Sequence, residues 1–463
     1  MRGSRVLDRG DQRAAMLMVL LNGFSLPMML SAVNVALPAI ADDLEMNAVM
    51  LSWVPMAFLM ASAALVLSFG RLSDMFGRKR MYLIGTAGLI VTSIVAAGAT
   101  SGATMIGFRL LQGISAAMIY GTHIAIVSSV YSPEERGRMI GLMVAAIYVG
   151  LTCGPFIGGW LIEYFGWQAA FLLHIPMCTI ALVVGFWWVK AEWRAESAGR
   201  FDFVGSILYT VAIVAVMYGI SSLPEIQSFA MIVLGATGFW LFFHHQHGRR
   251  DPLFDVSLFY TNRVFTLSCI ASVIMYTATF ANIVLVSLYL QYLQGMTPRE
   301  AGMVLMAQAL MMALISPYAG KLSDRIEPRL IASVGMGFTA VGLLLLASVG
   351  RTTPVVSVVA YLMTTGLGFS LFSSPNANAI MGSVDKHQYG VAGSSVATMR
   401  VVGQMSSMGI VAMAFALTIG PVQITPDIYP KLHTAIRLSF CIAAALCVPG
   451  IYLSLVRGRT RPG

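Results

Sequence analysis

Fourteen apolar runs of membrane-spanning length account for most of this 463-residue chain. A transmembrane helix needs about 20 predominantly apolar residues. Only 11% of the residues are charged, whereas soluble domains average about 25%. The runs cover approximately residues 14–38, 50–70, 81–99, 104–130, 139–162, 169–189, 203–221, 229–246, 263–291, 301–319, 330–348, 353–373, 390–418 and 434–456. They predict an all-α integral membrane protein with one transmembrane helix for each run.

The distribution of basic residues supports this topology. With the N-terminus in the cytoplasm, 23 of the 29 Lys and Arg residues fall in cytoplasmic segments. Only Arg299, Arg351, Lys431 and Arg437 fall outside, and Arg109 and Arg400 lie within membrane runs. Cytoplasmic loops of membrane proteins carry such an excess. We therefore expect a multi-pass protein with both termini in the cytoplasm, and the net charge of +9 needs no nucleic-acid partner.

A short charged loop occurs twice in the chain. The sequence G-R-L-S-D at residues 70–74 returns as G-K-L-S-D at residues 320–324, each time after the second run of a group of six. This repeat predicts two related six-helix bundles, residues 1–190 and 263–463, joined by residues 191–262 with two additional transmembrane helices. Internal repeats of this kind are typical of secondary transporters with a central site.

Three further motifs lie in separate membrane runs. They are R-L-L-Q-G at residues 109–113, G-L-T-C-G-P at residues 150–155 followed by two glycines, and N-V-A-L-P at residues 34–38. With residues 70–80, these motifs resemble the major facilitator superfamily and, within it, the fourteen-helix drug:proton antiporter group. The resemblance covers almost the whole chain. It implies the major-facilitator fold and a proton-coupled efflux pump that exports lipophilic or amphiphilic compounds by alternating access across a prokaryotic plasma membrane.

The repeated loop is a candidate gate. A carboxylate at a helix end can cap helix N–H groups and attract a positive helix terminus. The resemblance implies that Asp74 makes such a contact with the start of the penultimate helix, near residues 388–393. The alternative is that the loop charges only set the topology. The second copy departs from the pattern, with Glu327 and Pro328 where the first has Gly77 and Arg78. The gating candidates are Gly70, Asp74, Gly77, Arg78, Lys79 and Asp324.

Two arginines lie inside apolar runs. A charge at the centre of a membrane helix costs about 2.5–3.5 kcal/mol on insertion scales. The resemblance implies that Arg109 acts in proton coupling or substrate response. The alternative is an arginine that reaches toward the interface and bonds backbone carbonyls. Gln112 lies one turn on and shares its face, and Arg400 is the membrane arginine of the second half.

The fifth run carries a stripe of small residues. Gly150, Gly154 and Gly158 recur every four residues, so a neighbouring helix can approach closely. Pro155 removes a backbone hydrogen bond and predicts a kink. With Gly159, these residues form the antiporter motif, and the resemblance implies that the bend seals the inner cavity during antiport. Helix packing alone is the alternative.

The chain departs from the group at residue 29, where a methionine replaces the usual aspartate. None of the 20 acidic residues falls in the middle of an apolar run, although a buried carboxylate is the usual proton carrier. His123, inside the fourth run, is then the best titratable candidate, and His174 is the second. Both could instead be packing residues. Alternatively, the carrier is not proton-driven, and Arg109 and Arg400 favour neutral or anionic amphiphiles.

A substrate cavity is harder to read from sequence. Methionine adapts to varied apolar ligands, which makes Met28, Met29 and Met118 candidates together with Asn34, although ordinary packing also explains them. Expected partners are a small-molecule substrate, the lipid bilayer and, as the candidate coupling ion, protons. We expect a monomer.

Other functional classes lack their signatures in this sequence. It contains no H-E-x-x-H zinc motif, no nucleophile elbow and no Walker A motif. We therefore expect no enzyme, no catalytic residues, no cofactor and no metal, and we interpret the histidines at residues 244, 245 and 247 as a helix end. A non-transporting membrane sensor or scaffold remains the alternative from another class.

Overall fold

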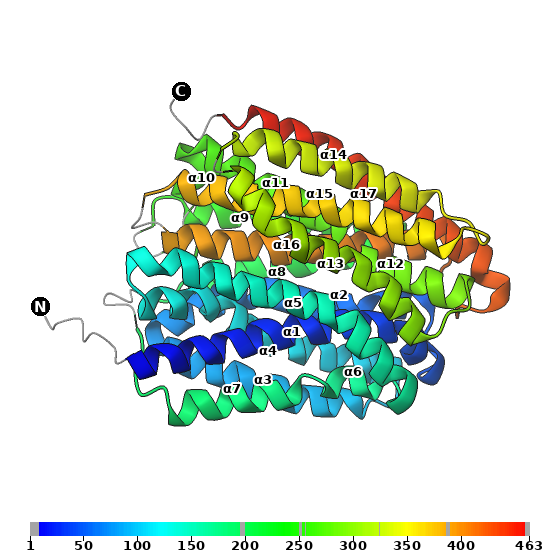
Figure 1. Ribbon diagram of the computed structural model, residues 1–463, viewed down its shortest axis with the longest axis horizontal. Helices are drawn as coiled ribbons and strands as arrows, with labels where there is room; N and C mark the ends of the chain where they lie inside the picture. The colour runs from blue at the N-terminus through cyan, green and yellow to red at the C-terminus, as the bar shows by residue number, and fades with distance from the viewer. Residues whose placement is uncertain are drawn as a thin grey trace, which may run out of the picture.

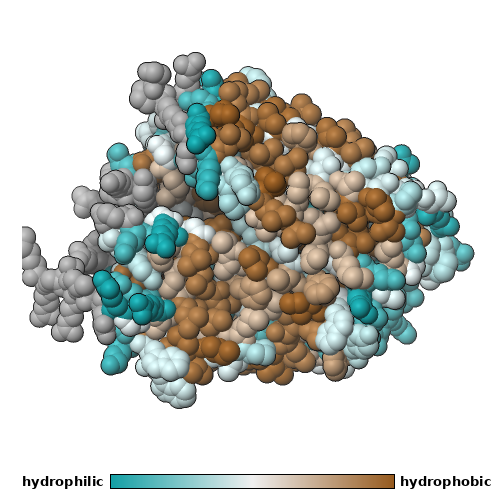
Figure 2. Space-filling model, viewed as in Figure 1, coloured by the Kyte–Doolittle hydropathy of each residue, from teal (hydrophilic) through white to brown (hydrophobic). Residues whose placement is uncertain are grey.

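The computed structural model describes residues 9–194, 200–249, 252–254, 256–323, 325–385 and 389–458. These ranges contain no strand, and they hold 14 helical spans long and apolar enough to cross a membrane. The predicted all-α membrane class and helix number are therefore confirmed. Figure 2 shows apolar side chains across the middle of one face and polar side chains toward both ends, as a membrane protein requires.

The first seven helices form one bundle, called here the N-half and drawn from blue to teal in Figure 1. Helix α1 packs on α5, and α4 packs between α2 and α3. The sixth predicted span is broken, because two residues separate α6 from α7. The bounds are α1 Arg9–Asp43, α2 Ala48–Phe76, α3 Arg78–Ala97, α4 Gly102–Val130, α5 Pro133–Phe165, α6 Gln168–Leu172 and α7 Ile175–Trp187.

The last helices form a second bundle, the C-half, drawn from yellow-green to red in the upper part of Figure 1. Its first span is broken into two helices and a short π-helix, so the backbone is irregular where the sequence predicts one continuous run. The bounds are α10 Ser257–Thr261, α11 Arg263–Thr279, α12 Asn282–Leu288, η1 Tyr289–Leu293, α13 Pro298–Ser323, α14 Pro328–Ala347, α15 Val355–Gly382, α16 Tyr389–Thr418, the 3-10 turn η3 Pro426–Ile428 and α17 Tyr429–Val456.

Helices α8, Phe203–Ser221, and α9, Ile226–Gln246, come between the two bundles in the chain. Helix α8 contacts α2 of the N-half and α16 of the C-half, whereas α9 packs mainly on α8. The hydroxyl oxygens of Ser206 and Ser68 lie 2.6 Å apart, and Thr210 donates to the carbonyl of Ala64 at 3.1 Å. The two additional helices therefore flank the seam between the halves.

Several long helices begin at polar caps that the sequence supplies. The side chain of Asn47 accepts from the backbone N–H of Met50 at 2.8 Å at the start of α2. Ser101 and Thr104 form a capping box at the start of α4. Such caps satisfy N–H groups that a helix leaves unpaired, so polar loop residues help to fix where α2 and α4 start.

The start of α1 and the end of α17 lie at one end of the molecule, on the left in Figure 1, which we call the terminal end. At the opposite, far end, hydrogen bonds join the halves. Gln291 donates to the carbonyl of Val35 at 2.9 Å, and Gln423 donates to the carbonyl of Glu45 at 3.2 Å. The Tyr292 hydroxyl donates to Asp42 at 3.3 Å. The structure is thus closed by inter-half bonds at its far end.

Candidate functional site

Arg109 is fully buried in α4. Its Nε donates to the carbonyl of Val54 at 2.9 Å, and its Nη1 donates to Gln112 Oε1 at 2.8 Å. The ring centroid of Phe58 lies 4.5 Å from the guanidinium carbon. Among the described residues, Nη2 has no hydrogen-bond partner and no carboxylate pairs with the guanidinium. Arg109 therefore bonds a backbone carbonyl, as the alternative interpretation expected, but it does so in the interior rather than at the interface.

A chain of polar side chains extends from Arg109. Gln112 donates from Nε2 to Ser93 Oγ at 2.7 Å, and Ser93 Oγ lies 3.2 Å from His174 Nε2. Ser93 belongs to α3, and His174 immediately precedes α7. His174 is fully buried. The structure thus connects the second histidine candidate to Arg109, a connection that sequence spacing did not predict.

His123 lies in a separate environment. Its Nε2 is 3.2 Å from the hydroxyl of Tyr82, and that hydroxyl donates to the carbonyl of Met18 at 3.1 Å. Because the single hydroxyl proton is used on Met18, the imidazole Nε2 acts as the donor to Tyr82. The side chain is 4% exposed. His123 is therefore a packed, hydrogen-bonded residue between α3 and α4.

Arg400 lies in the interior of α16 and is partly exposed. Its guanidinium carbon is 5.7 Å from the ring centroid of Tyr276. It also interacts electrostatically with Tyr148 and Tyr120 of the N-half. The Tyr148 hydroxyl oxygen lies 2.7 Å from Ser373 Oγ of α15, so this region joins the two halves. Arg400 thus faces the seam, whereas Arg109 is enclosed in the N-half.

The antiporter motif packs α5 against two helices. Glycines 150, 154 and 158 face α1, and a Cβ on Gly154 would lie 2.6 Å from the carbonyl oxygen of Met28. Gly159 instead faces Pro298 at the start of α13, and the carbonyl of Pro155 lies against Gly302 of the same helix. Helix α5 is continuous through Pro155. The motif therefore provides close packing within the N-half and across the seam.

The first loop copy forms a local ion pair. Asp74 Oδ1 accepts from Arg78 Nε at 2.8 Å, and Arg78 also donates to the carbonyl of Ala125 at 3.1 Å. Gly77 has φ +122°, a conformation that favours glycine. The partner region expected for Asp74, residues 388–393, begins at Gln388, which lies outside the described residues, as does Asp324 of the second copy. Gly70 packs against Gly121 of α4.

The linker reaches this loop. The backbone N–H of Lys79 donates to Glu192 Oε1 at 2.9 Å, and the backbone N–H of Arg78 donates to the carbonyl of Trp193 at 2.9 Å. A Cβ on Gly77 would lie 2.6 Å from Glu192 Cδ. The carboxylate therefore caps the start of α3, and the motif glycine leaves room for it. The Lys79 ammonium group donates to the carbonyl of Val189.

The residues predicted to line a cavity lie on two different helices, α1 and α4. Met28, Met29 and Asn34 are buried in α1, and neither amide atom of Asn34 has a hydrogen-bond partner among the described residues. The Cβ of Met118 lies against Gly85 of α3, so its role in a cavity stays a prediction. Which face of α4 turns toward α3 was not evident from the sequence.

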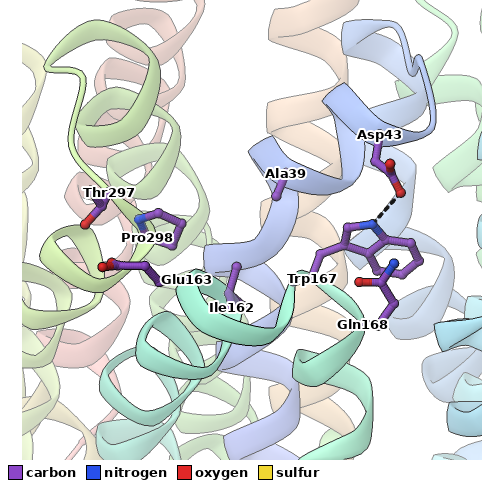
Figure 3. Close-up of a pocket in the computed structure, with 9 residues that line it drawn as sticks. Ala39, Asp43, Ile162, Glu163, Trp167, Gln168, Thr297 and Pro298 are labelled. Atoms are coloured by element: carbon purple, nitrogen blue, oxygen red, sulfur yellow. Dashed lines mark hydrogen bonds between the residues drawn. The ribbon is translucent and has the colours of Figure 1, made fainter.

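An open cavity of about 470 Å³ lies at the far end between the halves. Figure 3 shows Trp167 turned toward Asp43, and the indole N–H donates to that carboxylate at 2.8 Å. Thr297 and Pro298 of the C-half contribute the opposite wall. Sequence reasoning did not predict this cavity, because its lining comes from three loops or helix ends distant in the chain.

A family model described as the Major Facilitator Superfamily matches residues 19–407 and 267–463. The chain belongs to this superfamily. Riboflavin transporter RibZ of Clostridioides difficile (strain 630) is 29% identical over 433 residues, which cover 92% of this chain and 93% of RibZ. Multidrug resistance protein Stp of Mycobacterium tuberculosis (strain CDC 1551 / Oshkosh) is 30% identical over 392 residues, 83% of this chain and 72% of Stp.

The fold comparison agrees with this membership. The crystal structure of the human organic anion transporter MFSD10 (TETRAN) has a TM-score of 0.62 at 16% identity and covers 96% of this chain and 99% of that chain. The resemblance to multidrug-efflux-like members of the superfamily is confirmed by relatives such as Stp. This major facilitator is a multi-pass membrane transporter that acts on small-molecule substrates.

Sequence reasoning missed a buried arginine in this major facilitator. Arg457, counted above with the loop charges, is 1% exposed and donates from Nη1 to Ser268 Oγ at 3.0 Å and to Asn376. Burial lowers the pKa of its guanidinium to about 10, partly offset by Glu327, so it is charged at neutral pH. The sequence signal that could have indicated this buried arginine is the presence of polar Ser268 and Asn376, its partners, in apolar segments.

Asp202 is the second missed residue. It caps α8 by accepting from the N–H of Gly205 at 3.0 Å, and it also accepts from His245 at 3.1 Å and Gln246 at 2.7 Å. Arg249 forms an ion pair with the same carboxylate. These contacts join α8 to the end of α9 and give the histidine cluster a structural partner. No group of three potential metal ligands occurs in the described ranges.

Proposed function

We propose that this major facilitator exports lipophilic or amphiphilic small molecules by alternating access across the plasma membrane of a prokaryote. Both termini face the cytoplasm in this proposal, as the strong bias of basic residues toward one side supports. The observation that carries the proposal is the set of inter-half hydrogen bonds at the far end. Similarity to the multidrug resistance protein Stp supports an efflux role, whereas the relative RibZ is a riboflavin transporter.

The inter-half bonds suit a reversible gate. Neutral protein hydrogen bonds contribute about 0.5–1.5 kcal/mol each. A few such bonds, together with the close contact between α5 and α13, hold the far end closed without preventing its opening. Substrate bound between the halves would be released when these bonds break, and the cavity beside Trp167 lies at the same end of the molecule.

The domain division and the gating role also belong to this proposal. Residues 1–190 and 263–463 move as two bodies, and residues 191–262 connect them. The loop of Asp74 and Arg78 holds the terminal end of the N-half together through the ion pair and the contact with α4. Replacing Asp74 with Asn should slow transport while the protein still inserts into the membrane.

Proton coupling requires a titratable group in this proposal. Every described acidic residue within a helix lies at most three residues from the helix end, so a histidine is the candidate. His174 is connected to Arg109 through Ser93 and Gln112, and His123 is bonded to Tyr82. Transport that responds to a pH gradient in the wild type but not in His174→Ala or His123→Ala would identify the carrier.

A second candidate function is an anion-selective carrier without proton coupling. The specific observation that favours it is the pair of membrane arginines, Arg109 and Arg400, neither of which forms an ion pair with a described carboxylate. A net positive interior attracts anions and repels cations. The two candidates predict opposite charge preferences for the substrate.

Reconstitution in proteoliposomes tests both functions. Uptake of a lipophilic cation and a lipophilic anion is measured with and without an imposed pH gradient, with protein-free liposomes as the control. Gradient-dependent movement of either compound supports a proton-coupled exporter. Gradient-independent movement of the anion supports the second candidate. If neither compound moves faster than in protein-free liposomes, the transport proposal is wrong.

A further inference from the structure

Arg400 is a partly exposed positive charge at the seam between the halves. Arg400 is partly exposed although it lies well inside α16, whereas Arg109 is fully enclosed. The Nε of Arg400 has no hydrogen-bond partner among the described residues, and no described carboxylate pairs with it. A charged guanidinium in a membrane interior is costly unless a partner compensates it. Tyr276 hydrogen-bonds the guanidinium, but among the described residues no carboxylate supplies a compensating negative charge.

Aromatic side chains from both halves surround this charge. Tyr120 comes from α4 and Tyr148 from α5, whereas Tyr276 comes from α11 and Phe369 from α15. The ring centroid of Phe369 lies 5.5 Å from that of Tyr276 and 6.3 Å from that of Tyr148, both edge-to-face. The three tyrosines are partly exposed. We call Arg400 and these four aromatic residues the Arg400 site.

The Arg400 site suits a ligand that carries both an acidic group and an aromatic ring. A guanidinium offers a planar fork of donors that matches a carboxylate, and phenol hydroxyls can donate further hydrogen bonds to an anion. The rings of tyrosine and phenylalanine favour edge-to-face or offset contact with another aromatic ring. A cation would face an uncompensated positive charge, and a neutral ligand would leave the guanidinium without a counter-charge.

Resting on the proposed transport function, we infer that the Arg400 site binds an aromatic anion, with its carboxylate or equivalent acidic group on Arg400 and its ring among the tyrosines. The site draws residues from both halves, and Tyr148 also contacts Ser373 across the seam. An occupant of this site therefore touches the surfaces that separate when the halves move. The substrate itself supplies the negative charge that the membrane interior lacks.

Binding to the full-length protein in zwitterionic lipid nanodiscs tests the inference. Three nearly isosteric probes are titrated by calorimetry, namely 2-naphthoate, neutral 2-naphthamide and cationic 2-naphthamidinium, with empty nanodiscs subtracted. A charge-assisted contact predicts that naphthoate binds at least about tenfold more tightly than naphthamide, with naphthamidinium weakest. Equal affinities for the anion and the amide, or tightest binding of the cation, would overturn the inference.

Variants locate the effect. Arg400→Gln should remove the preference for naphthoate, whereas Arg299→Gln, which removes an exposed charge near the start of α13, should preserve it. If Arg400→Gln does not fold, Tyr120→Phe combined with Tyr276→Phe keeps the rings and should weaken naphthoate more than naphthamide. An undiminished preference in the folded Arg400→Gln variant, or in the double variant if that is the one tested, would refute the site.

The binding assay separates this inference from the proposed function. Binding in nanodiscs does not require transport, so naphthoate selectivity that depends on Arg400 supports the site even if no solute moves in proteoliposomes. Conversely, proteoliposomes that transport a lipophilic cation, with no naphthoate preference in nanodiscs, would refute the Arg400 site and leave the exporter proposal standing.

Discussion

The sulfur of Met29 lies 3.7 Å from Nη1 of Arg109. Residue 29 is the position at which the fourteen-helix antiporter group usually has an aspartate. The methionine that replaces this aspartate therefore lies directly beside the buried guanidinium of Arg109. A polarisable thioether is only a weak hydrogen-bond acceptor, so Met29 offers the guanidinium a weak contact where an aspartate would offer a full negative charge. The departure at residue 29 and the unpaired Arg109 are therefore one structural feature.

Restoring the carboxylate should stabilise this interior. In Met29→Asp, the new carboxylate would accept from Arg109 Nη1 and compensate a buried charge. We expect the Tm in detergent to rise by about 2 °C or more. Met28→Asp is the matched control, because Met28 is also buried in α1 but is not bonded to Arg109, and its Tm should fall. Equal losses of Tm in both variants would contradict the predicted ion pair.

Part of this site was predictable from the sequence. Arg109 and Gln112 are three residues apart on one helix, so their hydrogen bond follows from helical geometry. The contact with Met29 and the link through Ser93 to His174 depend on how α1, α3 and α7 cross α4. A single sequence contains periodicity but no crossing angles, which is why these partners emerged only from the fold.

The same limit applies to Met118 and Arg457. Methionine suits adaptable pockets, which makes Met118 a cavity candidate, whereas the close approach of α3 at Gly85 depends on how the helices cross. Arg457 follows a long apolar run and resembles a topology-setting charge. Its partners Ser268 and Asn376 lie on helices far away in sequence. The span number and fold, in contrast, depend on hydropathy and loop charge, which are local properties.

Close packing of α5 on α1 predicts a sharp difference between two glycines of one helix. A Cβ on Gly154 would lie 2.6 Å from the carbonyl of Met28, whereas a Cβ on Gly141 would meet nothing within 4 Å. Gly154→Ala should cost about 1–3 kcal/mol through overpacking and reduce transport. Gly141→Ala should be neutral or stabilising by about 0.5–1 kcal/mol. Thermal unfolding that ranks the two variants in the opposite order would contradict this packing.

The stability of the α8–α9 pair should depend on pH through Asp202. Burial alone would raise the pKa of this carboxyl, but hydrogen bonds from Arg249, Gly205, His245 and Gln246 outweigh it and hold the pKa well below the usual 3.8. A carboxyl group with a depressed pKa stabilises the folded protein at pH values above its ordinary pKa, and this stabilisation is lost as the pH falls. The Tm difference between wild type and Asp202→Asn should therefore be constant above about pH 5 and shrink below about pH 4.

Glu225 provides the control for this measurement. It precedes α9 as Asp202 precedes α8, but its side chain makes no capping hydrogen bond. Glu225→Gln should have the Tm of the wild type throughout the same pH range. A difference for Asp202→Asn that grows as the pH falls would show that the carboxylate does not stabilise the folded protein through these contacts.

Reversible opening of the far end is the central claim, and a cross-link tests it most directly. The backbone N–H of Ala48 donates to the carbonyl of Val422 at 2.9 Å, so these two segments of the chain are adjacent across the seam. Cysteines are introduced at both positions in a background whose five native cysteines are replaced, and transport is measured in proteoliposomes. Transport should stop on oxidation and return on reduction, whereas either single-cysteine protein should be unaffected. Full-rate transport by the cross-linked protein would contradict alternating access at this end.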